Sequence, residues 1–130
     1  MKLVVSLIVL VASASLYASG WNCKNQDARY PRAKLYNSTT NPRVPAAFVV
    51  SDSSGTVLSA RGSEISKRNL SNGVRYSAND GDVSAVLFVK HREGADAPLA
   101  EGEEVYGKLV VVGEDGRDTY DMWCARYLKN

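Results

Sequence analysis

The chain has few of the residues that most metal centres and acid–base sites use. Its 130 residues include one histidine, His91, and two cysteines, Cys23 and Cys124. These are too few soft ligands for a structural zinc site, and none of them stand at the spacing of a zinc finger. A pair of histidines for general acid–base catalysis is also lacking. The sequence therefore predicts no metal and no cofactor.

Long apolar runs are lacking as well, except at the N-terminus. Lys2 precedes an apolar run over residues 3–11, and small residues follow it up to Gly20. This order is typical of a secretory signal peptide, and the run is shorter than the roughly 20 residues that span a bilayer. We expect residues 1–20 to be a leader, cleaved after Gly20 or, less favourably, after Ala18, and we expect no membrane anchor. The alternative is a cytosolic protein whose first element is apolar.

Two cysteines without a third are expected to form a disulfide in a secreted chain. Cys23 stands just behind the predicted leader, and Cys124 lies six residues from the C-terminus. A bond between them would bring both ends of one domain together. Closing a loop of about 100 residues removes roughly 4 to 5 kcal/mol of unfolded-state freedom in the chain-entropy model. Residues 21–130 are too few for two domains, so we expect one domain and a monomer.

Basic and acidic residues are unevenly divided along the chain, although the net charge is only +2. Residues 21–76 hold nine Lys or Arg against three acids, whereas residues 77–130 hold six against eleven. A basic N-terminal half is suited to phosphate groups. The alternative is that the two halves neutralise each other across one small domain.

Short β-branched and aromatic runs predict an antiparallel sheet over most of the chain. The predicted strands cover residues 44–51, 56–60, 74–77, 84–91, 105–113 and 119–127. Turn pairs separate them at Ser54-Gly55, Asn72-Gly73, Asp80-Gly81 and Asp115-Gly116. Asn-Gly and Asp-Gly favour tight reversals because both residues tolerate positive φ.

Two of these segments, residues 83–89 and 109–112, are continuously apolar, which is typical of central strands covered on both faces. The predicted cover is one helix over residues 26–36, with Asp27 as its cap and Pro31 in its first turn. Because alternate residues of a strand face the same side, we expect one shared core. Its predicted members are Phe48, Val50, Val86, Phe88, Val110 and Val112.

Two sequons are candidate N-glycosylation sites after secretion. They are Asn37-Ser38-Thr39 and Asn69-Leu70-Ser71, and both lie in polar segments.

Three segments within residues 44–124 occur in an order that is typical of one protein family. Val44-Pro45-Ala46-Ala47-Phe48 precedes Arg75-Tyr76-Ser77, a polar turn and Ser84-Ala85-Val86-Leu87-Phe88, and residues 110–124 close the pattern with a strand, a turn and a strand ending in Cys. This layout resembles the small fungal guanyl-preferring ribonucleases, with their Tyr-Pro-His-x-Tyr, Val-Tyr-Ser and Asp-Arg-Val-Val-Phe segments. The resemblance implies a microbial-ribonuclease-like α+β fold, with one short α-helix packed on a central antiparallel β-sheet and a disulfide joining the N- and C-termini.

The groups that these ribonucleases use for catalysis are missing at the matching positions. Ala46 and Gly113 stand where the family has its two His, and Ala85 stands where it has its Arg. Glu64 is the one candidate remnant of the catalytic Glu, or else a surface residue. The resemblance therefore implies a pseudo-ribonuclease rather than an enzyme. Three arginines are candidate contacts to RNA or a partner, or else surface charge: Arg61, Arg75 and Arg117.

The triplet Trp21-Asn22-Cys23 directly follows the predicted leader, and Cys124 lies near the C-terminus. In this arrangement the chain is similar to a smaller group within these proteins, the RNase-like effectors that powdery mildew fungi secrete from their haustoria. This implies a secreted, non-catalytic virulence or avirulence factor that modulates plant immunity and is delivered into host cells. Its partners would be host plant proteins, an immune receptor among them, or weakly bound RNA. The alternatives are an active secreted guanyl-preferring ribonuclease and a small secreted inhibitor or toxin-like domain.

Overall fold

The computed structural model describes residues 19–90 and 103–128, which form nine β-strands and one short 3-10 turn. The strands are β1 (Ser19–Asn25), β2 (Arg32–Asn37), β3 (Pro45–Asp52), β4 (Gly55–Arg61), β5 (Ile65–Leu70), β6 (Gly73–Asp80), β7 (Val83–Lys90), β8 (Glu104–Gly113) and β9 (Gly116–Leu128). The 3-10 turn η1 (Gly62–Glu64) connects β4 to β5. In the part of the chain that is described, no helix is long and apolar enough to cross a membrane.

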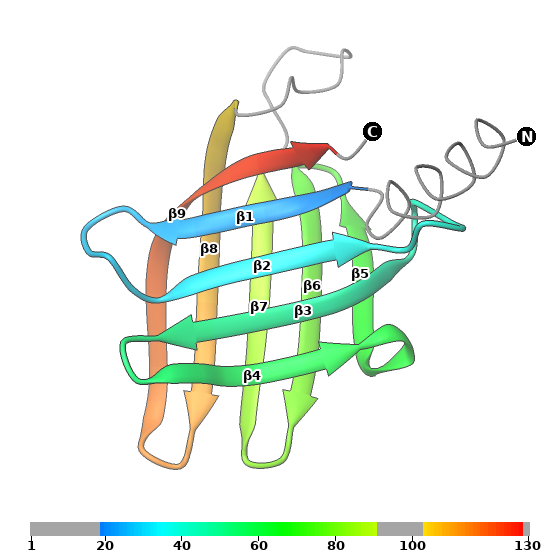
Figure 1. Cartoon of the computed structure of the whole chain (residues 1–130). Coiled ribbons are helices and arrows are strands. Elements are labelled where there is room, and N and C mark those ends of the chain that lie inside the picture. The colour runs from blue at the N-terminus through cyan, green and yellow to red at the C-terminus, as the bar shows by residue number, and fades with distance from the viewer. Residues whose placement is uncertain (1–18, 91–102, 129–130) are drawn as a thin grey trace, which may run out of the picture.

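All nine strands belong to one antiparallel sheet with the order β4-β3-β2-β1-β9-β8-β7-β6-β5. Every strand pairs with its neighbour in the chain except β4 and β5, and the first strand pairs with the last. The sheet curls over so that β1 to β4 cross in front of β5 to β8, while the long β9 bends from one half to the other (Figure 1). Contacts of β4 with β6 and of β3 with β5 leave a nearly closed, barrel-like sheet.

The predicted α+β fold is wrong, because the described residues contain no α-helix. The predicted helix over residues 26–36 is instead a turn followed by β2. Ala33 and Leu35 are fully buried whereas Arg32 and Lys34 are exposed, and this alternation suits a strand with one face on the core. Over residues 19–90 and 103–128, no ribonuclease-like helix is therefore packed on the sheet.

The six predicted strands are confirmed as β3, β4 and β6 to β9. Three of the predicted turn glycines have positive φ, namely Gly55, Gly81 and Gly116. The predicted leader, apart from Ser19 and Gly20 at the start of β1, lies outside the described residues, and so does His91.

Four of the six predicted core residues are wrong, because the predicted register of β7 and β8 is shifted by one residue. Phe48 and Val50 are buried as expected, at 0% and 1% exposure. In β7 and β8, however, the buried residues are the alternate ones: Ala85, Leu87, Val89 and Leu109. The other predicted members form an outer apolar stripe on the opposite face of the sheet: Val86, Phe88, Val110 and Val112. A continuously apolar strand has two similar faces, so its pattern alone does not decide which face is buried.

The predicted disulfide is confirmed, and it links two neighbouring strands in the middle of the sheet. Cys23 of β1 and Cys124 of β9 are directly opposed, with Cα atoms 4.0 Å apart, and both are fully buried. Because β1 and β9 are the first and last strands along the chain, the bond joins its two near-terminal strands, whereas the edges of the sheet are β4 and β5. A closed loop with a sequence separation of 101 residues lies between the two sulfurs.

Candidate ligand-binding face

The positions that match the ribonuclease catalytic groups do not share one site. Ala85 is a core residue with 1% exposure. Ala46 borders a groove over β3, whereas Gly113 borders a different pocket at the turn between β8 and β9. No single substrate group could contact all three positions.

Glu64 has a local structural role in η1. Its carboxylate Oε1 accepts a hydrogen bond from the backbone N–H of Arg61 at 2.8 Å. This contact caps the 3-10 turn that leads from β4 into β5. The side chain is exposed, and nothing in its surroundings pairs it with a second acid–base group of the predicted set.

The three predicted contact arginines lie apart from one another. Arg61 ends β4, in the front half of the sheet. Arg75 is on the outer face of β6, directly opposite Arg68 of the edge strand β5. Arg117 is near the start of β9, where it pairs with Val112. They therefore do not form one basic patch.

The two sequon asparagines differ in accessibility. Asn37 is half-buried at a β-bulge, and its Nδ2 donates a hydrogen bond to Ser19 Oγ at 3.0 Å. Its Oδ1 is buried and has no partner. Asn69, in the edge strand β5, is exposed.

The strongest candidate for a binding surface is a row of aromatic and cationic side chains across four strands. Tyr106 of β8 is opposite Trp123 of β9, Trp123 is opposite Lys24 of β1, and Lys24 is opposite Arg32 of β2. Directly opposed side chains have Cβ atoms roughly 4.5 to 5.5 Å apart, so these four form one continuous strip on the outer face. We call this set the aromatic–cationic row.

Trp123 is the most unusual member of the row. It is 42% exposed, although the residues on either side, Met122 and Cys124, are fully buried. The alternation of β9 directs Trp123 outward, because the disulfide fixes Cys124 on the core side. A large aromatic side chain held at the surface by its strand is available for stacking against a ligand.

Tyr106 is oriented by a carboxylate beside the row. Its hydroxyl donates a hydrogen bond to Asp121 Oδ1 at 2.7 Å. This hydrogen bond is the main reason that the pKa of Tyr106 is raised, with burial and the charge of Asp121 adding to it. The hydrogen bond thus fixes the direction of the phenol group toward β9.

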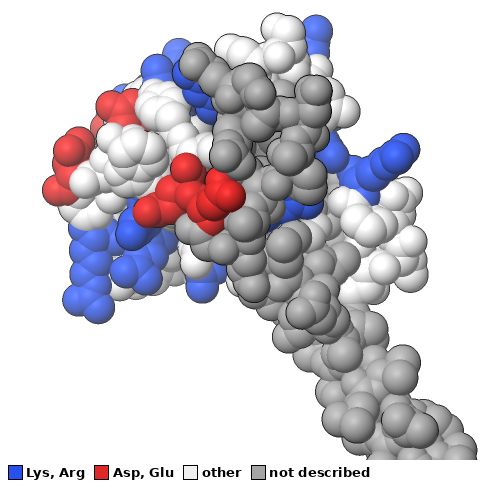
Figure 2. Space-filling view, turned by 90° about the horizontal axis from the view of Figure 1, so that it is seen from above, with Lys and Arg blue, Asp and Glu red and all other residues white. Residues whose placement is uncertain are grey.

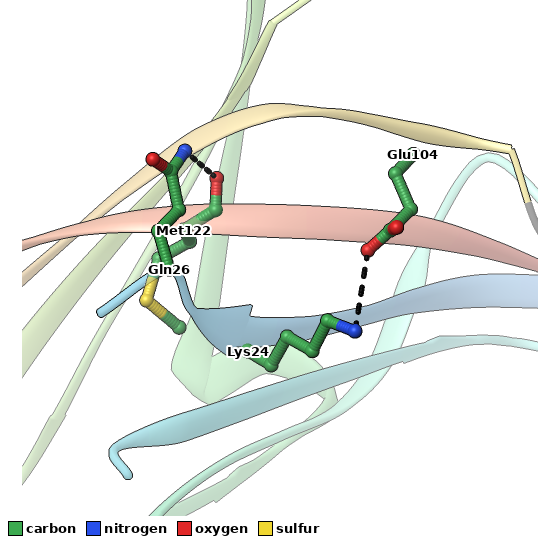
Figure 3. A network of polar contacts seen from close by, with 4 residues as sticks. All are labelled: Lys24, Gln26, Glu104 and Met122. Carbon is green, nitrogen blue, oxygen red and sulfur yellow. Dashed lines mark hydrogen bonds and ion pairs between the residues drawn. The ribbon is translucent and has the colours of Figure 1, made fainter. Parts of the chain in front are cut away.

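Two polar contacts connect the strands that carry the row. Figure 3 shows Lys24 reaching across β9 to Glu104 of β8, where Lys24 Nζ and a Glu104 carboxylate oxygen are 3.7 Å apart. Gln26 Nε2 donates to the backbone carbonyl of Met122 at 3.1 Å. The ion pair is exposed on both sides and adds little stability, but it directs the Lys24 ammonium group across β9 toward Glu104.

One further cation lies near each end of the row, Arg29 at one end and Lys108 at the other. The guanidinium carbon of Arg32 is 5.5 Å from the centre of the Tyr30 ring, and that of Arg29 is 5.9 Å from the same ring. At the other end, Lys108 is exposed on β8 opposite Asp121. From above, Lys and Arg side chains gather at the lower left of the molecule beside Asp and Glu side chains (Figure 2). At the β2 end of the row, two guanidinium groups thus lie close to the ring of Tyr30.

An acidic pocket of about 510 Å³ lies at the turns between β6 and β7 and between β8 and β9. Its acidic lining residues are Asp52, Asp82, Glu114, Asp115 and Asp118, and no Lys or Arg lines it. A hydrogen bond from the Ser54 hydroxyl, together with one from the Ser54 backbone N–H, lowers the pKa of Asp52, which keeps this carboxylate charged. The described residues form no group of three or more side chains suited to a metal ion. The clustered carboxylates of this pocket would repel phosphate groups.

No known protein family, curated protein sequence or solved structure matches this chain. A function must therefore be argued from the geometry of the described residues.

Sequence reasoning missed the row because its members come from four strands, two of which were not predicted. One signal could have found it. If Cys124 is assumed to face the core, alternation along the predicted last strand places Trp123 outward.

Proposed function

We propose that the protein is a secreted, non-catalytic binding protein that holds single-stranded RNA on the aromatic–cationic row. The observation that carries this proposal is the in-register series Tyr106, Trp123, Lys24 and Arg32 on the outer face of four neighbouring strands. Proteins that bind single strands combine aromatic platforms for the bases with cationic groups that follow the backbone. The row supplies both within one strip.

The expected energetics follow from the exposure of Trp123. Stacking of a base on an aromatic side chain contributes about 1 to 3 kcal/mol per base, and it accepts any base. Lys24 and Arg32 would neutralise phosphates and release counterions, which makes binding sensitive to salt. We therefore expect weak to moderate affinity with little sequence preference.

The surroundings of the row support binding without cleavage. Of the two carboxylates beside it, Glu104 is paired with Lys24 and Asp121 accepts the Tyr106 hydroxyl. Cleaving RNA requires a base for the ribose hydroxyl and an acid for the leaving oxygen, and the loss of one such group costs about 10² to 10⁴-fold in rate. Each carboxylate already contacts a member of the row, and the row contains no histidine to serve as the acid.

The effector role remains part of the proposal on sequence grounds. The predicted leader and the Trp21-Asn22-Cys23 triplet with its distant Cys124 support a secreted effector directed at a plant host. The ribonuclease-like fold no longer supports it, because the sheet has no helix packed on it among the described residues.

A second candidate function is the binding of a host protein. It is favoured by the outer apolar stripe, in which Val86 and Val110 are directly opposed and Val112 is 40% exposed. Contiguous apolar surface of this kind is typical of protein–protein contacts.

Fluorescence anisotropy with a short labelled single-stranded RNA tests the proposal, and a denaturing gel of the same samples tests for cleavage. We expect saturable binding that weakens as salt rises from ~50 to ~200 mM, with the RNA intact. Absent or salt-insensitive binding would favour the protein partner instead. Cleavage above a buffer control would restore the ribonuclease alternative.

A further inference from the structure

A groove of about 530 Å³ lies over β3 on the outer face of the front half of the sheet. Its floor consists of small side chains, Ala47 and Val49. Tyr36 of β2 stands opposite Ala47 on one side, and Arg61 of β4 stands opposite Ala47 on the other. The groove therefore has an aromatic wall, a cationic wall and a low floor between them.

The distance between the Tyr36 wall and the Arg61 wall leaves room for one planar ring. Tyr36 and Arg61 are two strands apart, which corresponds to roughly 9 to 10 Å across the sheet. A ring stacked between two flat groups needs about 3.5 to 4 Å on each side. The gap over Ala47 is thus wide enough for one ring and too narrow for two.

The charge of the groove selects an anionic ligand. Lys34 is opposite Val49, and both Lys34 and Arg61 are exposed. The hydroxyl of Ser59, which is also opposite Val49, faces the same groove. Two carboxylates bond to the backbone of lining residues, Glu64 to Arg61 N–H and Asp80 to Ser59 N–H, but neither of them lines the groove itself. The guanidinium plane of Arg61 suits both stacking and phosphate contacts.

We propose that this groove is a nucleotide site, in which a base lies over Ala47 between Tyr36 and Arg61 and the phosphate is directed toward Lys34. The site uses no residue of the aromatic–cationic row, so it does not depend on that row binding RNA. A volume of about 530 Å³ is in the usual range for small-ligand pockets. The ligand is either a free nucleoside monophosphate or the phosphorylated end of an RNA strand, which offer the same ring and charge.

NMR titration of the ¹⁵N-labelled protein with adenosine 5′-monophosphate tests the site. We expect saturable shifts of the Ala47, Val49 and Arg61 amides. Adenosine lacks the phosphate and ribose 5-phosphate lacks the ring, so each should bind roughly tenfold more weakly or worse. A 5′-phosphorylated trinucleotide that binds tighter than the mononucleotide would identify a strand end as the ligand, and equal affinity would identify the free nucleotide.

Two variants control the assignment. Ala47→Leu fills the floor and should weaken nucleotide binding by about tenfold or more, whereas Val112→Leu on the outer apolar stripe should leave it unchanged. Arg61→Gln, which keeps the length of the side chain without its charge, should weaken binding even if Ala47→Leu disturbs the strand. An absence of saturable shifts, or shifts that persist in both groove variants, would overturn the site.

Trp123→Ala separates this site from the proposed function. Nucleotide binding that survives in this variant while RNA binding is lost supports two separate sites. RNA binding without any nucleotide binding in the wild type would overturn the groove site and leave the proposed function standing.

Discussion

Gly107 lies beside the disulfide, so close that a Cβ atom on it would be 2.6 Å from Cys124 Sγ. The same atom would be 2.9 Å from the backbone carbonyl oxygen of Phe88 in the neighbouring strand. Real Cβ atoms do not approach other atoms so closely, and neither neighbour is a flexible chain end. The space for the buried disulfide thus depends on the missing side chain of Gly107.

Gly107→Ala should therefore destabilise the protein by about 1 to 3 kcal/mol, the usual cost of overpacking a core. Gly113→Ala is the matched control in the same strand, because a Cβ there has no atom within 4 Å. Urea unfolding of both variants measures the difference. Equal stability of the two variants would show that the disulfide has room to move.

The corrected strand register predicts opposite outcomes for two residues of β8. Leu109 is fully buried, and Leu109→Ala should cost about 2 to 5 kcal/mol. Val112 is 40% exposed, and Val112→Ala should cost less than about 1 kcal/mol. Chemical denaturation tests both. A larger loss for Val112→Ala would restore the register that the sequence pattern first indicated.

The buried phenol of Tyr76 should make stability depend on alkaline pH. Burial raises its pKa to about 12, while a hydrogen bond from Trp21 and the charge of Arg126 act in the opposite direction. Above about pH 10 the unfolded chain loses this proton and the folded protein keeps it. The free energy of unfolding contributed by Tyr76 is therefore fully present below about pH 10 and is lost as the pH rises through about 12.

Unfolding midpoints of the wild type and Tyr76→Phe, measured between neutral and alkaline pH, isolate this effect. The wild type should lose stability more steeply than Tyr76→Phe in the alkaline range. Parallel curves for the two proteins would mean that the phenol titrates normally in the folded state.

Accessibility predicts which sequon is modified when the protein passes through a eukaryotic secretory pathway. Asn69 is exposed in an edge strand, whereas Asn37 is half-buried and its Nδ2, the atom that would carry the glycan, is already bonded to Ser19. Intact mass spectrometry should show a glycan that disappears in Asn69→Gln and persists in Asn37→Gln. The reverse pattern would indicate that Asn37 is accessible during folding.

The sequence was most informative where local chemistry decides structure. Turn pairs such as Asp80-Gly81 and Asp115-Gly116 located hairpins correctly, because glycine tolerates the positive φ observed there. The disulfide was also predictable, since two cysteines in a chain expected to be secreted have only each other.

Features that depend on long-range pairing were harder to predict. Residues 26–36 were assigned to a helix, although β2 is fixed by its pairing with β1 and β3 and by burial of Ala33 and Leu35. The apolar runs of β7 and β8 did not show which face is buried, because that choice depends on how the whole sheet curls. The candidate site was not predicted, since its residues meet only when β9 pairs with β1.

The central claim is that Trp123 stacks on RNA, and a matched pair of variants tests it most directly. Affinity for a labelled single-stranded RNA is measured by anisotropy for Trp123→Ala and for Val112→Ala, both exposed apolar side chains on the outer surface. Thermal unfolding first confirms that both variants are folded. We expect Trp123→Ala to weaken binding by roughly tenfold, as the loss of one stacked base requires, and Val112→Ala to bind like the wild type. Unchanged affinity of a folded Trp123→Ala protein would contradict the account.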